Sequence, residues 1–337
     1  MITTPDALLI ALREHGLLDT PAAGLAAAAP RPTADERPWF IGALLGASGW
    51  LAGLCVLGFV GLLFRPTSPA AAGLAGAVLL GAAWGLYKAD REGAFVAQLA
   101  LALSIAGQCL VLYAMTGPMH SFAPIAPAAF ALQVALALLM PNPLHRTLST
   151  WFAAIAWGVA VRSHLVGDPG LFGASSRGVT SLPMALAAWC VAWFPVAGLL
   201  LALIRTEPRW MAQGWQGVCR PVAAGLIVGL ASATLVSQPF ESLRGLVGGA
   251  AAQDWAALWP ALSALGALAG LAAAFALGHR GLVGLCGVAA LLHVAHFYYA
   301  LGTSLRMKSM LMLLTAGAML FAANRLAARR PTPGAHA

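Results

Sequence analysis

Two histidines three residues apart are the side chains in this sequence best suited to chemistry. His293 and His296 stand in an otherwise apolar run, where imidazoles are seldom left without a partner. Their spacing puts both on one face of a helix, about one turn apart. A third ligand would make the pair a metal site, and a chain of water would make it a proton path. The alternative is that the pair bonds to neighbouring helices and fixes their packing. The sequence favours packing because nothing in it fixes a third partner, so no cofactor is expected.

The segment after this pair adds an aromatic side chain and two cations. Tyr299 ends the apolar run, and Arg306 and Lys308 follow within ten residues. The two cations would receive an anionic headgroup or substrate at the membrane surface, or would simply extend to the interface. Together with the two histidines these residues form the candidate functional cluster, and no catalytic residue is assigned.

Several kinds of machinery are missing from the sequence. It has no glycine-rich phosphate loop of the GxxxxGK or GxGxxG type, no HExxH, no GxSxG and no CxxC spacing. All eleven carboxylates fall outside the apolar runs. Ion-coupled carriers usually keep an acid near the membrane midplane, so this distribution weakens a transporter function. We expect the protein not to be an enzyme.

The elements that position these residues follow from composition. Of 337 residues, 60% are hydrophobic and 9% are charged, against about 45–50% and about 25% in soluble domains. The apolar residues are grouped in runs of about the length that a membrane-crossing helix needs. The sequence therefore predicts an all-α, polytopic transmembrane helix bundle in contact with the lipid bilayer. The net charge of +8 comes from scattered basic residues, which argues against a nucleic-acid partner.

Hydropathy predicts about ten spans. They cover residues 39–64, 70–87, 93–114, 123–140, 147–166, 182–204, 221–237, 256–277, 282–301 and 309–326. Lys and Arg are more frequent in the N-terminal segment, the even-numbered connections and the C-terminus, which predicts that both termini lie in the cytoplasm. We expect a cytoplasmic helical hairpin over residues 1–36, a multi-pass transmembrane domain over 37–327 and a disordered cytoplasmic tail over 328–337.

Small and neutral polar residues indicate how the helices pack. Five pairs of glycines four residues apart predict close helix crossings: Gly42 and Gly46, Gly49 and Gly53, Gly81 and Gly85, Gly225 and Gly229, and Gly266 and Gly270. Gln98, Gln108 and Gln133 lie inside predicted spans. We expect them to form hydrogen bonds between helices.

Particular stretches resemble a known family. Residues 296–301 (HFYYAL), Lys308 with Ser309, and residues 324–326 (NRL) are similar to the bacterial multi-pass family called domain of unknown function 4401, as are residues 12–17 (LREHGL) and 49–52 (GWLA). The resemblance implies an integral protein of the bacterial inner membrane, and the family has no established activity. It also implies a small envelope protein, encoded nearby, as a partner in a membrane complex.

These observations lead to one expected function and two alternatives. We expect a non-enzymatic inner-membrane protein that belongs to an envelope complex or handles a lipid-soluble compound. The first alternative is a secondary transporter of a small molecule. The second is a membrane-embedded metalloenzyme that uses His293 and His296.

Overall fold

The computed structural model describes most of the chain. It covers residues 39–64, 68–90, 93–116, 122–165, 182–233 and 258–300, and single positions or short stretches between 305 and 324. The predicted N-terminal hairpin and C-terminal tail lie outside the described residues, as does most of the predicted tenth span. All secondary structure in the described part is helical.

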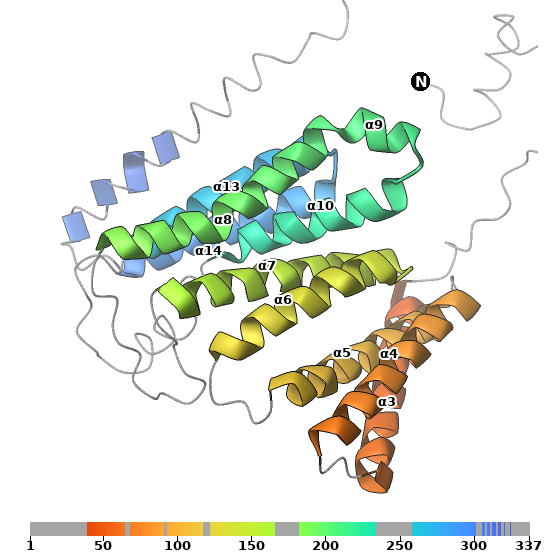
Figure 1. The fold of residues 1–337 in the computed structure, drawn as a ribbon. Coiled ribbons are helices and arrows are strands. Elements are labelled where there is room, and N and C mark those ends of the chain that lie inside the picture. The colour runs from red at the N-terminus through yellow and green to blue at the C-terminus, as the bar shows by residue number, and fades with distance from the viewer. Residues whose placement is uncertain are drawn as a thin grey trace, which may run out of the picture.

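Ten helices are described, and they run back and forth as neighbours in space (Figure 1). They are α3 (Trp39–Phe64), α4 (Pro69–Ala89), α5 (Ala94–Thr116), α6 (Phe122–Leu139), α7 (Pro143–Leu165), α8 (Leu182–Arg205), α9 (Glu207–Ala212), α10 (Gln216–Ala231), α13 (Leu258–Ala276) and α14 (Arg280–Ala300). Each of the first nine predicted spans overlaps one of these helices. Only α9, the shortest, was not predicted as a span.

Five of the described helices are long and apolar enough to cross a membrane, namely α3, α4, α5, α8 and α14. Apolar stretches in α6, α10 and α13 are shorter, and α7 is of similar length but more polar. The outward surface agrees with a hydrocarbon surrounding, because many large apolar side chains are exposed, Leu44 at 71% and Phe59 at 62% among them. The described part of the chain is therefore all-helical, and its long apolar helices are those of a membrane protein. The number of ten crossings stays a prediction.

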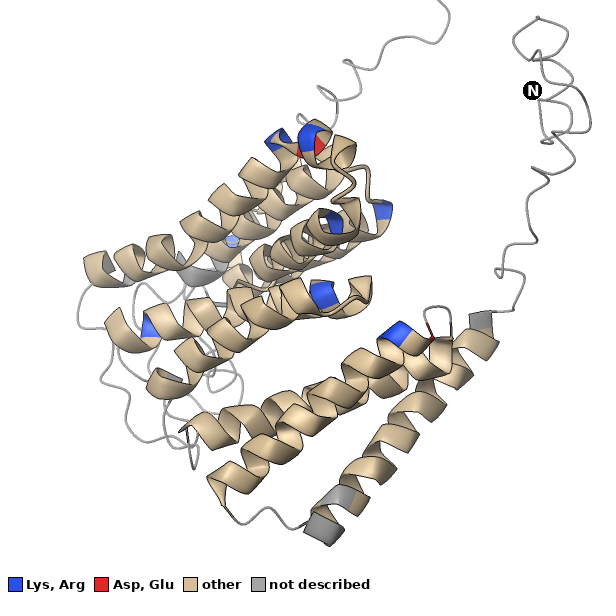
Figure 2. Cartoon of the chain, turned by 45° about the vertical axis from the view of Figure 1, so that its right-hand side comes forward, with Lys and Arg blue, Asp and Glu red and all other residues tan. Residues whose placement is uncertain are grey.

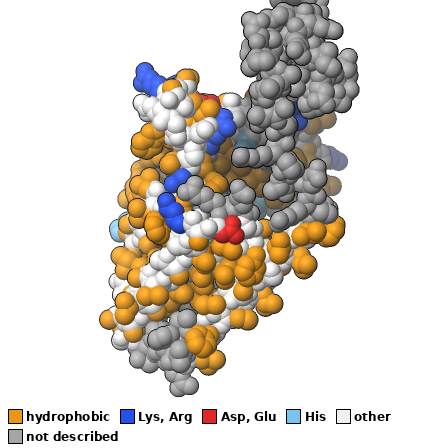
Figure 3. Space-filling view, turned by 90° about the vertical axis from the view of Figure 1, so that its right-hand side faces the viewer, with side chains coloured by type: hydrophobic (Ala, Val, Ile, Leu, Met, Phe, Trp, Pro, Cys, Tyr) orange, Lys and Arg blue, Asp and Glu red, His pale blue; other side chains and the backbone are white. Residues whose placement is uncertain are grey.

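Charged residues lie near the ends of the helices (Figure 2). Lys88, Arg146, Arg205, Arg220 and Arg280 stand at or near the helix ends joined by the short α4–α5, α6–α7, α8–α10 and α13–α14 connections. These ends lie together, and we call this side the basic end. In Figure 3 basic side chains gather in the upper half of the visible face, whereas hydrophobic side chains cover most of the lower half.

Helices α3, α4 and α5 pack through small residues. Gly76 of α4 and Gly107 of α5 face each other so closely that an added Cβ at either would lie 2.7 or 2.8 Å from the other's carbonyl oxygen. Gly49 and Gly53 bring α3 against α5 in the same way. Close backbone approach of this kind replaces the hydrophobic effect as a packing force inside lipid.

The predicted glycine pairs are partly confirmed. Gly225 and Gly229 pack on α7, and Gly266 and Gly270 pack on α10. The prediction is wrong for Gly42 and for the pair in α4, because an added Cβ there would meet no atom of the described residues within 4 Å. Glycine spacing marks a flat helix stripe but does not say whether another helix covers it. The pair Gly76 and Gly107 was missed because its members lie on different helices.

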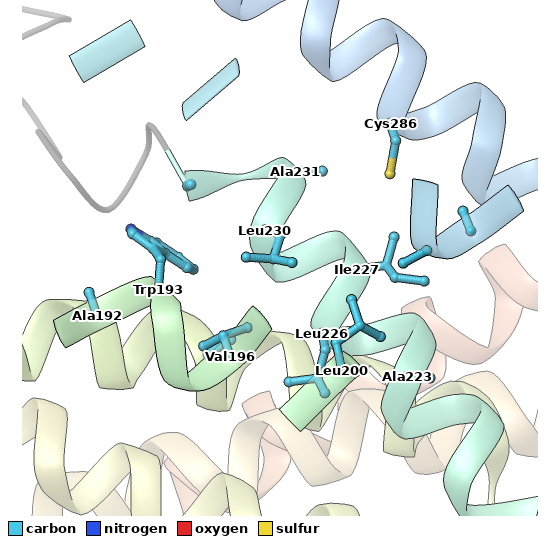
Figure 4. Packing of buried hydrophobic residues seen from close by; sticks show 14 of the residues in the cluster. Ala192, Trp193, Val196, Leu200, Ala223, Leu226, Ile227, Leu230, Ala231 and Cys286 are labelled. Atoms are coloured by element: carbon cyan, nitrogen blue, oxygen red, sulfur yellow. The ribbon is translucent and has the colours of Figure 1, made fainter. Parts of the chain in front are cut away.

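Helices α8, α10 and α14 enclose the larger apolar core. In Figure 4 side chains from the three helices point toward one another, with Trp193 and Val196 on α8, Leu230 and Ile227 on α10, and Cys286 on α14. Ile227 and Cys286 have no exposed surface. This core fixes α10 at the centre of the C-terminal helices, where it also contacts α7.

Side chains of neighbouring helices satisfy backbone carbonyls that the helices leave without a donor. Proline has no N–H, so Pro195 in α8 and Pro221 in α10 each free the carbonyl four residues earlier. Those carbonyls belong to Val191 and Gly217. The first accepts from Trp157 Nε1 at 3.3 Å, and the second from Arg146 Nη1 at 2.7 Å. Such replacement bonds make prolines tolerable in membrane helices.

Candidate functional site

The predicted histidine pair lies on α14, and one member is bonded to a neighbouring helix. His293 is buried, and its Nε2 is 2.8 Å from the carbonyl oxygen of Ala231. A carbonyl only accepts, so this nitrogen carries the proton. Ala231 is the last residue of α10, where carbonyls lack a partner within the helix. His293 therefore ties α14 to the end of α10, as the packing interpretation expects, while His296 is half-buried.

The rest of the predicted cluster is only partly described. Arg306 is exposed, and the side chain of Tyr299 and all of Lys308 lie outside the described residues. Within the described ranges, no three His, Cys, Asp or Glu residues come close enough to hold a metal ion. The structure thus brings His293 and His296 together on one helix, without a third ligand from the part of the chain that it describes.

A groove lies between four helices in the middle of the chain. It has a volume of about 410 Å³, within the range of about 300–1,000 Å³ that is typical of small-molecule sites. Helices α6, α7, α8 and α10 contribute its walls: Phe130, Val134, Ala137, Leu138, Thr150, Ala153, Ala154, Trp157, Pro195, Val196, Leu199, Val222 and Leu226.

The walls of this groove offer no unpaired polar side chain. Of the lining residues only Thr150 and Trp157 carry a polar side-chain atom. Thr150 Oγ1 donates to the Arg146 carbonyl at 2.8 Å, and Trp157 Nε1 donates to the Val191 carbonyl. A polar ligand would lose hydrogen bonds to water here without replacing them. The groove therefore suits a hydrocarbon chain.

Close contact between α7 and α10 sets the floor of the groove. A Cβ added to Gly225 would lie 2.5 Å from the Thr147 carbonyl oxygen and 2.6 Å from Thr150 Cβ. One added to Gly229 would lie 2.9 Å from Ala154 Cβ. Without side chains at these two positions α10 rests directly on α7, and α6 and α8 stand on either side as the walls.

A second apolar hollow lies between α3 and α5. It measures about 450 Å³ and is lined by residues such as Trp50, Leu54 and Cys109. Here the helices touch at Gly49 and Gly53, whereas an added Cβ at Gly61 would meet nothing within 4 Å among the described residues. Two helices frame this hollow, whereas four frame the first.

A buried chain of polar side chains joins α5, α6 and α7 beside the groove. Gln133 Nε2 donates to Gln108 Oε1 at 2.6 Å, and Gln108 Nε2 donates to Ser104 Oγ at 3.1 Å. Ser104 Oγ is 2.7 Å from His145 Nε2, and His145 Nδ1 is 3.1 Å from Ser149 Oγ. All five side chains are buried. The expected bonding of Gln108 and Gln133 between helices is confirmed.

Each of these bonds can run from donor to acceptor in the same direction along the chain of side chains, from Gln133 to Ser149. With the proton on Nδ1, His145 accepts from Ser104 and donates to Ser149, so one neutral imidazole completes the chain. The ring of Tyr87 from α4 stands edge-on to it, with centroids 5.8 Å apart. The chain therefore ties the α3–α5 group to α6 and α7. Among described residues Gln133 Oε1 is buried without a bonding partner.

Sequence reasoning missed His145 as the centre of this chain. His145 and Ser149 are four residues apart, as are Ser104 and Gln108, so each pair shares a helix face. That spacing was the available signal, because polar stripes on apolar helices usually face protein rather than lipid. The position of His145 beside Arg146, near a predicted span end, made it resemble an ordinary loop residue.

Arg146 lies on α7 one turn before the groove residue Thr150, toward the basic end, and does not itself line the groove. Its Nη1 bonds to the Gly217 carbonyl, and its Nε is buried without a hydrogen-bond partner in the described structure. The one ion pair recorded among the described residues joins Arg220 to Glu207 at 3.8 Å, with both side chains partly exposed. Such a surface pair contributes little to stability. The charge of Arg146 has no carboxylate counter-ion there.

Comparison with known proteins identifies one family. A family model described as a domain of unknown function (DUF4401) matches residues 38–330, a range that includes every described helix. No curated protein and no solved structure matches the chain. The match confirms the family that the sequence resembles.

Proposed function

We propose that this chain, an all-helical membrane protein that belongs to the family described as domain of unknown function DUF4401, holds the hydrocarbon part of a lipid-soluble compound. The observation that carries the proposal is the apolar groove between α6, α7, α8 and α10. Its volume suits a small ligand, and its few polar atoms are already bonded. The protein acts as a binding component and not as an enzyme.

The proposal includes a placement in the bacterial inner membrane, with about ten crossings and both termini in the cytoplasm. Support comes from the basic end, whose helix ends carry Lys88, Arg146, Arg205 and Arg220. Lys and Arg are retained on the cytoplasmic side of membranes. The groove then begins near the cytoplasmic surface and runs toward the membrane interior.

A photoreactive lipid tests the groove directly. The purified protein is reconstituted with a phosphatidylcholine that carries a diazirine in one acyl chain, extracted into detergent, freed of loose lipid and irradiated. Lipid on the open surface is diluted by detergent, whereas a chain held in the groove is retained. We expect the label, mapped by peptide mass spectrometry, on groove residues such as Val134 and Ala153.

Matched double variants supply the control. Val134→Phe with Leu199→Phe narrows the groove from α6 and α8, and both positions are already partly exposed. Leu139→Phe with Leu201→Phe places the same side chains on the same helices outside the groove. We expect the first pair to lose most of the retained label and the second to keep it. Equal retention, or label spread evenly over exposed leucines, would show that the groove holds no ligand.

A further inference from the structure

We infer that the compound held in the groove carries an anionic phosphate headgroup, and that the guanidinium group of Arg146 binds it at the basic end. The inference rests on the proposed function, because it assigns the headgroup of the same ligand. The ligand class is thus a membrane amphiphile with one hydrocarbon chain in the groove and a phosphate at the surface.

The helical register of α7 places Arg146 in line with the groove. Thr150, Ala153 and Trp157 line the groove at intervals of three and four residues. Arg146 precedes Thr150 by four residues, so it continues the same face one turn beyond. A rise of 1.5 Å per residue puts it about 6 Å further along the axis. The Thr150 hydroxyl bonds to the Arg146 carbonyl, which confirms an unbroken helical turn between them.

The bonding of Arg146 leaves its charge available to a ligand. A guanidinium group has five N–H donors and a permanent charge. Nη1 is held by the carbonyl that Pro221 frees on Gly217, so the group is positioned by the fold. Nε is buried without a partner, and no carboxylate pairs with the group in the described ranges. Nε itself has no exposed surface, so an anion from outside the chain would contact the rest of this partly exposed group, and the uncompensated charge favours such an anion.

The neighbouring charges make phosphate the favoured anion at a lipid surface. Arg205 and Arg209 are exposed at the same end of the bundle, and Arg220 is only partly engaged by Glu207. Together they add a positive field that attracts anionic headgroups to this surface. Arg146 differs from them because it lies on the helix face of the groove, where its guanidinium group can donate to two phosphate oxygens at once.

Two probes with identical diazirine chains test the headgroup, phosphatidylglycerol and phosphatidylcholine. In the detergent-retention experiment we expect the wild-type protein to retain the anionic probe about fivefold more than the zwitterionic one, since one Arg near the surface contributes about that factor. Arg146→Gln should remove most of this preference and leave retention of phosphatidylcholine unchanged. Arg146→Lys keeps the charge and should keep most of the preference.

Arg209→Gln is the matched control, because it removes the same charge at the same end and away from the groove face. It should keep the preference. Equal effects of the Arg209 and Arg146 substitutions would overturn the inference, since a general field would then explain the selectivity. Melting of each variant in detergent shows whether it is folded.

Two further measurements make the inference independent of the variants. A phosphatidyl probe with the diazirine in its headgroup should label residues next to Arg146 and Gly217, and label confined to other sites would refute the assignment. Displacement of the anionic probe by inorganic phosphate would identify a soluble anion instead of a lipid. If the two lipids with diazirine chains are retained equally in the groove, only the headgroup inference is refuted. If neither is retained there, the proposed function is refuted.

Discussion

Replacing Gly225 by alanine tests whether the contact between α7 and α10 is as close as the structure shows. The new Cβ would meet the Thr147 carbonyl oxygen at 2.5 Å and Thr150 Cβ at 2.6 Å. The first of these is a backbone atom of an adjacent helix, so the conflict is not relieved by turning a side chain. The helices must move apart, and overpacking of this kind costs about 1–3 kcal/mol.

Alanine also gains helix propensity over glycine, by about 1 kcal/mol. The net loss in the free energy of unfolding at Gly225 is therefore about 0–2 kcal/mol. Gly198 in α8 separates the two effects, because nothing lies within 4 Å of its added Cβ. Gly198→Ala gains the same helix propensity without a steric conflict at the new Cβ. The difference between the two variants should be about 1–3 kcal/mol in favour of Gly198→Ala.

The assay is equilibrium unfolding of both variants by sodium dodecyl sulfate in mixed micelles, followed by helical circular dichroism. Gly225→Ala should unfold at a lower mole fraction of the denaturing detergent than Gly198→Ala. If Gly225→Ala proves equally or more stable, α10 does not rest on α7 as described. The contact between α7 and α10 that was described as the floor of the groove would then be absent as well.

Two other substitutions probe buried bonds with the same assay. His145→Phe keeps an aromatic ring beside Tyr87 but loses the bonds to Ser104 and Ser149, and should lower the free energy of unfolding by about 1–3 kcal/mol. The double variant with Ser104→Ala should lose less than the two single variants summed. Strict additivity would mean that the two residues are not bonded. Trp157→Phe removes the donor to the carbonyl freed by Pro195 and should cost about 1 kcal/mol. In a Pro195→Ala background, where the helix regains its own donor, that cost should fall, and an unchanged cost would contradict the pairing.

Some of the hydrogen bonds between helices could be predicted from single residues. Gln108 and Gln133 were expected to bond between helices because an amide in hydrocarbon needs a partner, and they bond to each other. His293 was expected to favour packing, and it bonds to the end of α10. In each case the physical need belongs to the residue itself, and the structure adds only the identity of the partner.

The groove and the hydrogen-bonded side chains around His145 could not be predicted from single residues. Thr150, Trp157 and Pro195 look like ordinary members of apolar runs, and each acquires its role from a residue on another helix or from a position along the groove. Arg146 was counted only as a loop charge for orientation. Its place at the end of the groove face depends on where α7 begins, which the sequence put four residues too late.

The sequence alone determined that most of the chain lies in hydrocarbon and that its segments are helices, because a long apolar segment in hydrocarbon must satisfy its backbone hydrogen bonds as a helix. The sequence also marked which carbonyls would lose a donor, since a proline's missing N–H is a local property. Only the tertiary structure decided that Trp157 and Arg146 would supply the replacements and that four helix faces would leave a groove between them. Inside a membrane the hydrophobic effect does not choose between helix faces, so close approach at residues such as Gly225 and side-chain bonds between helices make that choice.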